Sequence, residues 1–131
     1  MKGSCGMIRN AQESFDAKAK GEKFQKDLVA LIQEVLPEHK DVIVSSPMSA
    51  HGEDIQILTP EARKAFPFSV EAKHREKGFS PVYTAYEQAA RQVNAISSAL
   101  SIYAVAAIQQ QGHDPLIVIS ADDFLELITK K

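Results

Sequence analysis

The apolar residues of this chain change their spacing several times, and these changes constrain its fold more than any other feature of the sequence. One stripe at helical spacing, ended by Pro37, predicts a first long helix. It consists of Phe24, Leu28, Leu31, Ile32, Val35 and Leu36. A second stripe, from Val82 to Leu100, predicts another helix of about five turns. Short β-branched or alternating runs predict strands at residues 41–46, 54–58, 66–73, 103–108 and 116–120, and residues 121–128 fit a terminal helix.

The order of these elements predicts an α/β fold. One helix, three strands, a second helix, two strands and a last helix pack most naturally as a mixed central sheet flanked by helices. The chain has 131 residues, which is the length of one domain. We therefore expect a single domain over residues 21–131. Residues 1–20 lack an apolar stripe and are expected to form an N-terminal extension that is loose or crosses to a partner.

Composition excludes several classes of protein. With 44% apolar and 24% charged residues, the chain is neither wholly disordered nor collagen-like. The longest uncharged stretch, residues 92–112, contains many polar residues, so no membrane span and no membrane partner are expected. The first residues lack the apolar core of a secretory signal, which favours a cytoplasmic location. The single Cys5 excludes an internal disulfide and a multi-cysteine zinc site.

Positive and negative charges nearly balance over the whole chain, but the basic residues are clustered at particular places in the sequence. A net charge of −2 does not indicate a general nucleic-acid binder. A local basic patch nevertheless extends from residue 63 to residue 77, around Glu71, and consists of Arg63, Lys64, Lys73, His74, Arg75 and Lys77. A second basic cluster in residues 18–26 is interleaved with acids and is typical of a solvated helix face.

Two carboxylates and one ammonium group are expected to converge on the sheet. Alternation places Glu71 and Lys73 on one face of the strand predicted at residues 66–73, and Asp54 lies in the preceding strand. Charged side chains on a central strand are costly to desolvate, and a divalent cation would be an effective partner for Asp54 and Glu71. The alternative is a surface salt bridge between Glu71 and Lys73.

These residues also resemble a known motif. The segments Gly52-Glu53-Asp54-Ile55 and Phe68-Ser69-Val70-Glu71-Ala72-Lys73 are similar to the two halves of the PD-(D/E)XK nuclease motif, although Glu53 stands where that motif has its proline. Asp54 matches the first acid, and Glu71-Ala72-Lys73 matches the E-x-K half. Within the PD-(D/E)XK superfamily, the amino-acid sequence of these segments is similar to that of small bacteriophage nucleases related to Holliday-junction resolvases. The resemblance covers residues 21–94 and implies a restriction-endonuclease-like αβββαβ core.

The resemblance implies a metal site of oxygen ligands. Asp54 and Glu71 would bind Mg²⁺, for which Mn²⁺ would be expected to substitute, and the backbone carbonyl of Ala72 would complete the shell. Lys73 would orient the attacking water and stabilise developing charge, or act as general base if the site depresses its pKa.

Two further catalytic residues are implied by position in the helices. Glu22 in the first helix would reach the metal site, and Gln88 in the second helix would join the catalytic residues. Each lies about 120° from the centre of its apolar stripe, at the border of the buried face. The basic patch would then provide phosphate contacts, from Arg63, Lys64, His74, Arg75 and Lys77.

Together these features predict a Mg²⁺-dependent deoxyribonuclease that hydrolyses phosphodiester bonds. The resemblance implies branched DNA, such as Holliday junctions, as substrate, phage DNA recombination as the setting, and the host cytoplasm as the location. A homodimer is expected because cutting two strands in a coordinated way needs two sites related by a two-fold axis. The alternative is a catalytically silent nucleic-acid-binding or assembly module on the same fold.

Overall fold

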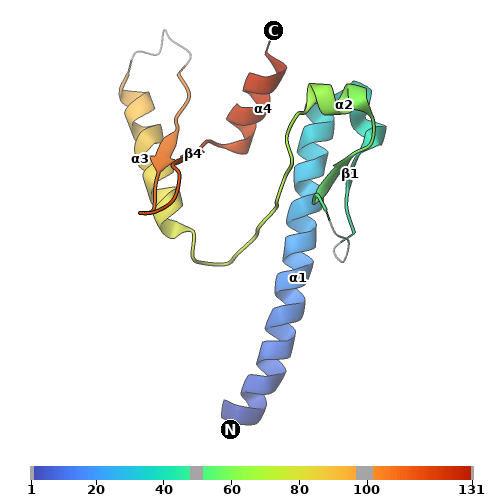
Figure 1. Ribbon diagram of the computed structural model, residues 1–131. Coiled ribbons are helices and arrows are strands. Elements are labelled where there is room, and N and C mark those ends of the chain that lie inside the picture. Colours follow the sequence, from blue (N-terminus) through green and yellow to red (C-terminus); the bar gives the residue numbers. More distant parts are fainter. Residues whose placement is uncertain (1, 48–51, 97–101, 131) are drawn as a thin grey trace. The chain divides into compact units, whose positions relative to one another are not determined.

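The computed structural model describes residues 2–47, 52–96 and 102–130 of the chain (Figure 1). The chain forms two compact units, residues Met1–Arg75 and Glu76–Lys131. The first unit contains the helix α1 (Lys2–Val35), the 3₁₀ helix η1 (Pro37–Val42), the strands β1 (Ile43–Ser45) and β2 (Ile55–Ile57), and the helix α2 (Pro60–Ala65). The second contains α3 (Ser80–Ala95), β3 (Ala106–Ile108), β4 (Leu116–Val118) and α4 (Ala121–Thr129). The prediction of one domain over residues 21–131 stays a prediction.

The helix α1 is longer than the apolar stripe that predicted it. Its backbone continues from Lys2 through Gly21 and ends where Pro37 follows, because proline has no N–H to donate and its ring opposes further helix. The N-terminal residues expected to form an extension are therefore helical from Lys2 on. The buried face of α1 consists of Gln25, Val29, Ile32 and Leu36, at spacings of four, three and four residues.

The core of the first unit forms where α1 packs on a small hairpin. β1 and β2 are antiparallel, with Ile43 opposite Ile57 and Ser45 opposite Ile55. Ile43 and Ile55 have no exposed surface, and Ile32 of α1 and Phe66 after α2 are almost completely buried with them. Burial of side chains of this size contributes about 1.5–3 kcal/mol each, so these four residues dominate the stability of the unit.

The sequence analysis missed α2. Thr59 caps this helix, because its Oγ1 accepts a hydrogen bond from Ala62 N at 3.1 Å. Pro60 lies in the first turn, where its missing N–H costs nothing, and Glu61 stabilises the positive end of the helix dipole. Thr-Pro-Glu is thus a helix start signal that was interpreted as the end of a strand and a turn.

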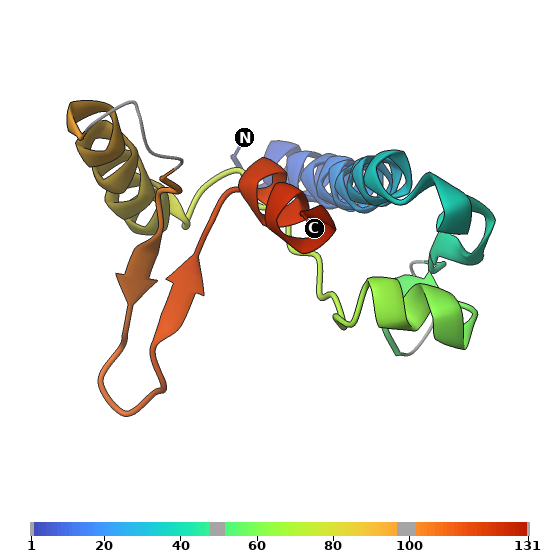
Figure 2. The ribbon, with the colours of Figure 1, turned by 90° about the horizontal axis from the view of Figure 1, so that it is seen from above.

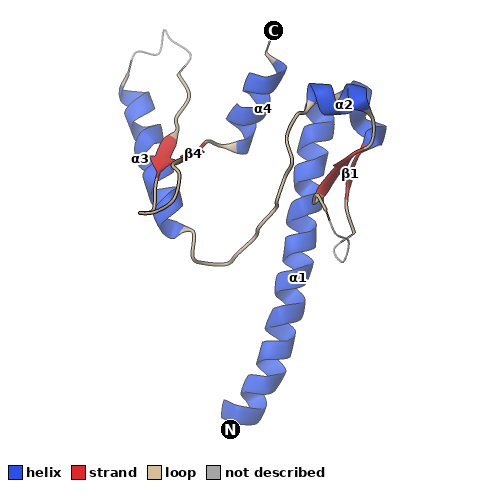
Figure 3. Cartoon of the chain, viewed as in Figure 1, coloured by secondary structure: helices blue, strands red, loops and turns tan. Residues whose placement is uncertain are grey.

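The structure confirms a chain of helices and small antiparallel sheets, whereas the single mixed sheet of a restriction-endonuclease-like core stays a prediction. Among the described residues there are two separate two-stranded antiparallel sheets, β1–β2 and β3–β4 (Figure 3). Residues 68–75, which include most of the third predicted strand, contain no strand. Pro67 has no N–H, Phe66 N donates to Ala62 O at the end of α2, and the N–H of Ala72 donates to a side chain. The N–H groups at positions 66 and 72 are therefore used outside a strand ladder, and position 67 has none to offer.

The second unit follows the sequence prediction more closely. The half-buried positions of α3 include Val82, Tyr86, Ala89 and Val93, as its stripe predicted, and the predicted continuation over residues 97–100 lies outside the described residues. β3 and β4 run in opposite directions in Figure 2, with Ala106 opposite Val118. Ser120 caps α4, since its Oγ accepts from Asp123 N at 3.1 Å. The strands predicted at 103–108 and 116–120 are present only over Ala106–Ile108 and Leu116–Val118, and the terminal helix is confirmed.

In none of the three described stretches is there a helix with the length and apolar character needed to cross a membrane.

Candidate functional site

The structure brings the two halves of the acid, acid, lysine pattern into direct contact. Asp54, immediately before β2, accepts a hydrogen bond on Oδ2 from the backbone N–H of Ala72 at 2.6 Å. The backbone of Asp54 is held on both sides, since its N–H donates to Val70 O at 3.2 Å and its carbonyl accepts from Ser46 N at 2.9 Å. Asp54 is therefore fixed beside the residue that separates Glu71 from Lys73.

Glu71 and Lys73 lie on the same side of their segment, as the alternation predicted. The Lys73 Nζ lies 3.6 Å from the Glu71 Oε1, and the two side chains are 72% and 67% exposed. An ion pair this exposed contributes little to stability, because water screens both charges. Both groups can therefore turn from each other toward a ligand at small cost.

Arg63 of α2 cross-links the two segments that carry the acids. Its Nη2 donates to the Glu53 Oε1 at 2.5 Å, and its Nη1 donates to the Phe68 carbonyl at 2.9 Å. Glu53 immediately precedes Asp54, and Phe68 leads into the Glu71 segment. The hydrogen bond from Arg63 lowers the pKa of Glu53, although burial acts in the opposite direction. Arg63, predicted as a phosphate contact, is thus engaged in holding the fold around the site.

Gln25 anchors the same end of the hairpin to α1. This residue is only 4% exposed, and its Nε2 donates to Ser45 Oγ and to the Ser46 carbonyl, both at 2.8 Å. Because Ser46 N in turn donates to the Asp54 carbonyl, Gln25 is connected to Asp54 through one residue. The sequence analysis missed Gln25. The signal was its place on the buried face, four residues before Val29, where a polar side chain needs partners.

Glu22 lies one turn before Gln25 on α1. Its carboxylate is 46% exposed and its Oε1 pairs with Lys26 Nζ at 2.9 Å. No three acidic, histidine or cysteine side chains within the described parts of the chain are grouped closely enough to hold a metal ion. The participation of Glu22 in a metal site stays a prediction.

The donor set that remains fits Mg²⁺. Asp54, Glu71 and the Ala72 carbonyl are hard oxygen donors, and one oxygen of Asp54 is not used by Ala72. Mg²⁺ keeps several of its waters and usually takes only one or two carboxylates from a protein. Asp54 and Glu71 supply two carboxylates, the second of them two-thirds exposed, and so meet that requirement in number.

The other predicted residues lie at several places. Lys64 is exposed on α2, and His74 and Arg75 are exposed at the end of the first unit. Lys77 and Gln88 are exposed in the second unit, Gln88 on α3. The candidate site is therefore built from residues of the first unit alone.

Comparisons with protein-family models, with curated proteins and with solved structures found no match to this chain. Function is accordingly inferred from the contacts around Asp54 and from the resemblance of two segments to the nuclease motif.

Proposed function

We propose that this chain is a Mg²⁺-dependent deoxyribonuclease that hydrolyses phosphodiester bonds, on a core of the PD-(D/E)XK kind. The observation that carries the proposal is the hydrogen bond from Ala72 N to Asp54 Oδ2. It joins two segments that are distant in sequence and resemble the two halves of one motif. The alternative, a surface salt bridge between Glu71 and Lys73, would not need Asp54 to be held beside these two residues.

The residues divide the work of hydrolysis between them. Asp54, Glu71 and the Ala72 carbonyl would hold Mg²⁺, which when bound lowers the pKa of water and neutralises charge on the phosphate. Lys73 lies beside the Glu71 carboxylate, so its ammonium group is available to orient a water and to stabilise the charge that develops on the phosphate. Glu22, on α1 of the same unit, is proposed as a further member of the site, and the catalytic role of Gln88, which lies in the second unit, stays a prediction.

The substrate and assembly follow from the same proposal. Branched DNA is the substrate class, and a homodimer would provide one active site for each of two strands. Exposed basic side chains flank the Glu71 segment and would contact phosphates, namely Lys64, His74, Arg75 and Lys77.

A nicking assay tests the proposal. The full chain is incubated with supercoiled plasmid in Mg²⁺, with and without EDTA, beside the variants Asp54→Asn and Glu71→Gln. Glu34→Gln, which changes an exposed carboxylate of α1 in the same way, is the matched control. We expect nicking by the wild type and Glu34→Gln only, and none in EDTA. Normal nicking by a folded Glu71→Gln protein contradicts the proposal. A wild type that binds DNA but never cuts it indicates the silent binding module.

A further inference from the structure

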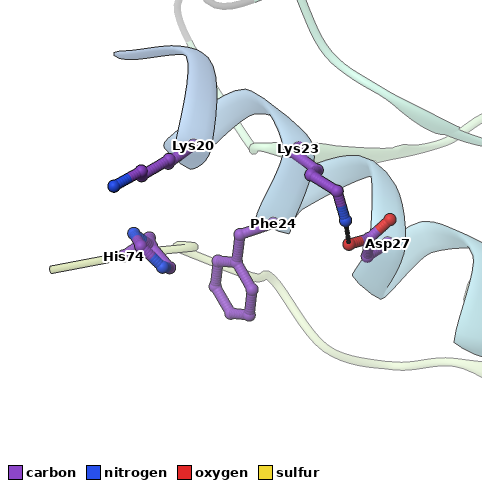
Figure 4. A pocket seen from close by; sticks show the side chains of 5 residues that line it. All are labelled: Lys20, Lys23, Phe24, Asp27 and His74. Carbon is purple, nitrogen blue, oxygen red and sulfur yellow. Dashed lines mark hydrogen bonds and ion pairs between the residues drawn. The ribbon is translucent and has the colours of Figure 1, made fainter. Parts of the chain in front are cut away.

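A pocket in the first unit lies between α1 and the residue that follows Lys73 (Figure 4). Its volume is about 260 Å³, just below the usual range of ligand pockets, about 300–1,000 Å³. It is lined by Lys20, Lys23, Phe24, Asp27 and His74. The pocket is therefore of a size for one small planar group and not for a large ligand.

The lining of this pocket carries more positive than negative charge. Two lysines of α1 line it against one carboxylate, Asp27, which pairs with Lys23 Nζ at 2.6 Å. The Lys23 side chain is 76% exposed, so this pair is screened and can open toward a bound anion. Lys20 and Lys23 are three residues apart and so lie on neighbouring turns of one helix face.

An aromatic pair forms the other part of the lining. The ring centroids of Phe24 and His74 are 6.0 Å apart and their planes are inclined by 46°. Phe24 was expected in the core, but the buried face of α1 passes through Gln25 and Val29, and Phe24 is only half-buried. Figure 4 shows its ring directed from α1 toward the segment of His74. The phenyl face is thus presented at the surface beside cations.

We propose that this pocket binds one unpaired nucleotide of a DNA strand. The base would stack on Phe24 and His74, and the adjoining phosphate would lie against Lys20 and Lys23. Aromatic rings combined with a cationic lining are the means by which proteins bind single strands without sequence preference. A base within a duplex is stacked between its neighbours and does not enter such a pocket unless it leaves the stack.

The inference deepens the proposed function. It rests on that function, because the position of the pocket matters only if Glu71 and Lys73 belong to an active site. His74 directly follows Lys73 in the chain. A DNA strand held at His74 would therefore pass within a few residues of Glu71 and Lys73. Among branched DNAs, this favours flapped and gapped substrates, which carry unpaired nucleotides, over a fully paired four-way junction.

Fluorescence anisotropy in Ca²⁺ tests the inference without cleavage. The probes are a labelled thymidine oligonucleotide and a blunt duplex of equal length. We expect the wild type to bind the single strand more tightly than the duplex. Phe24→Leu should weaken single-strand binding by about 5- to 150-fold, the range for losing one base stack, and leave duplex binding unchanged. His74→Ala should weaken single-strand binding by a similar factor, and by more than it weakens duplex binding, because His74 is also proposed as a phosphate contact. His74→Tyr, which keeps a ring, should bind like the wild type.

Matched variants separate stacking from charge and from folding. Lys23→Gln should weaken binding and flatten its dependence on salt, whereas Lys40→Gln, an exposed lysine of η1, should do neither. His39→Ala is the control for His74→Ala, and thermal melting of Phe24→Leu confirms its fold.

The inference is overturned if the duplex is bound as tightly as the single strand, or if Phe24→Leu and His74→Ala bind like the wild type. Binding that follows these expectations, without cleavage in Mg²⁺, refutes the nuclease proposal alone.

Discussion

The most direct test of the bracing around the site is to remove the guanidinium of Arg63. We expect Arg63→Met to lower the free energy of unfolding by about 1–3 kcal/mol. Both hydrogen bonds of Arg63 involve the charged guanidinium, and a hydrogen bond to a charged group contributes about 1.5–3 kcal/mol. Because 37% of the Arg63 and 31% of the Glu53 side chain are exposed, water screens the pair, and the expected loss is that of about one such bond instead of two.

Removal of the Arg63 guanidinium should lower the rate of plasmid nicking as well as the stability of the fold. Without Arg63, neither the residue before Asp54 nor the segment leading to Glu71 is tied to α2. A displacement of about 1 Å in a catalytic group can lower the rate by about 100-fold. Plasmid nicking should therefore fall more than stability does. Arg63→Lys, which keeps the charge but not the planar fork, should be intermediate.

Urea unfolding of the full chain measures the first effect, and Lys64→Met is the control. Lys64 is the next residue of α2, carries the same charge and is exposed. A double-mutant cycle with Glu53→Gln should give a coupling of about 0.5–3 kcal/mol, as for residues in contact. Equal urea midpoints for Arg63→Met and Lys64→Met, or a coupling near zero, would refute the idea that Arg63 holds the two segments together.

Further predictions concern the hydrogen bonds and charges of the same unit. Gln25→Leu should lower the free energy of unfolding by about 1–3 kcal/mol in urea titration, because the buried Ser46 carbonyl loses its donor; unchanged stability contradicts this. Lys73→Met should abolish nicking in Mg²⁺ yet keep the wild-type melting temperature, and substantial residual nicking would exclude its role. The pKa of Glu53 lies below its usual value of 4.5, so its contribution to stability is present above that pH and is lost as pH falls through the lower, folded value. The stability difference between wild type and Glu53→Gln should therefore shrink as pH is lowered from 7 to 3, and a constant difference would be inconsistent with the lowered pKa.

Local patterns predicted those parts of the fold that local sequence determines. The strand pair around Ile43 and Ile55, the stripe of α3 and the capped α4 follow from periodicity and start signals. Likewise, the common side of Glu71 and Lys73 follows from strand alternation over two residues. These features depend on residues that are close together in the sequence, and a single sequence contains that information.

What the sequence could not predict depends on choices between distant hydrogen-bond partners. Arg63 was predicted as a phosphate contact, because its partners, Glu53 and the Phe68 carbonyl, are brought to it only by the fold of α2. Gln25 was not singled out because the predicted stripe directs Phe24 and Leu28 toward the core, whereas in the structure Gln25 and Val29 are the buried residues on this part of α1. The strand predicted at residues 66–73 is absent, and the N–H of Ala72 donates to the side chain of Asp54, 18 residues away in sequence, instead of to a neighbouring strand.

The hydrogen bond between Ala72 and Asp54 has a consequence for how this chain can evolve. Its donor is the peptide group, so the side chain at position 72 is irrelevant to the contact that joins the two halves. Selection acting on that contact would leave position 72 free to drift among all residues except proline, which alone lacks the N–H. The residue most central to the arrangement would then be the one whose identity in related chains reveals the least about it.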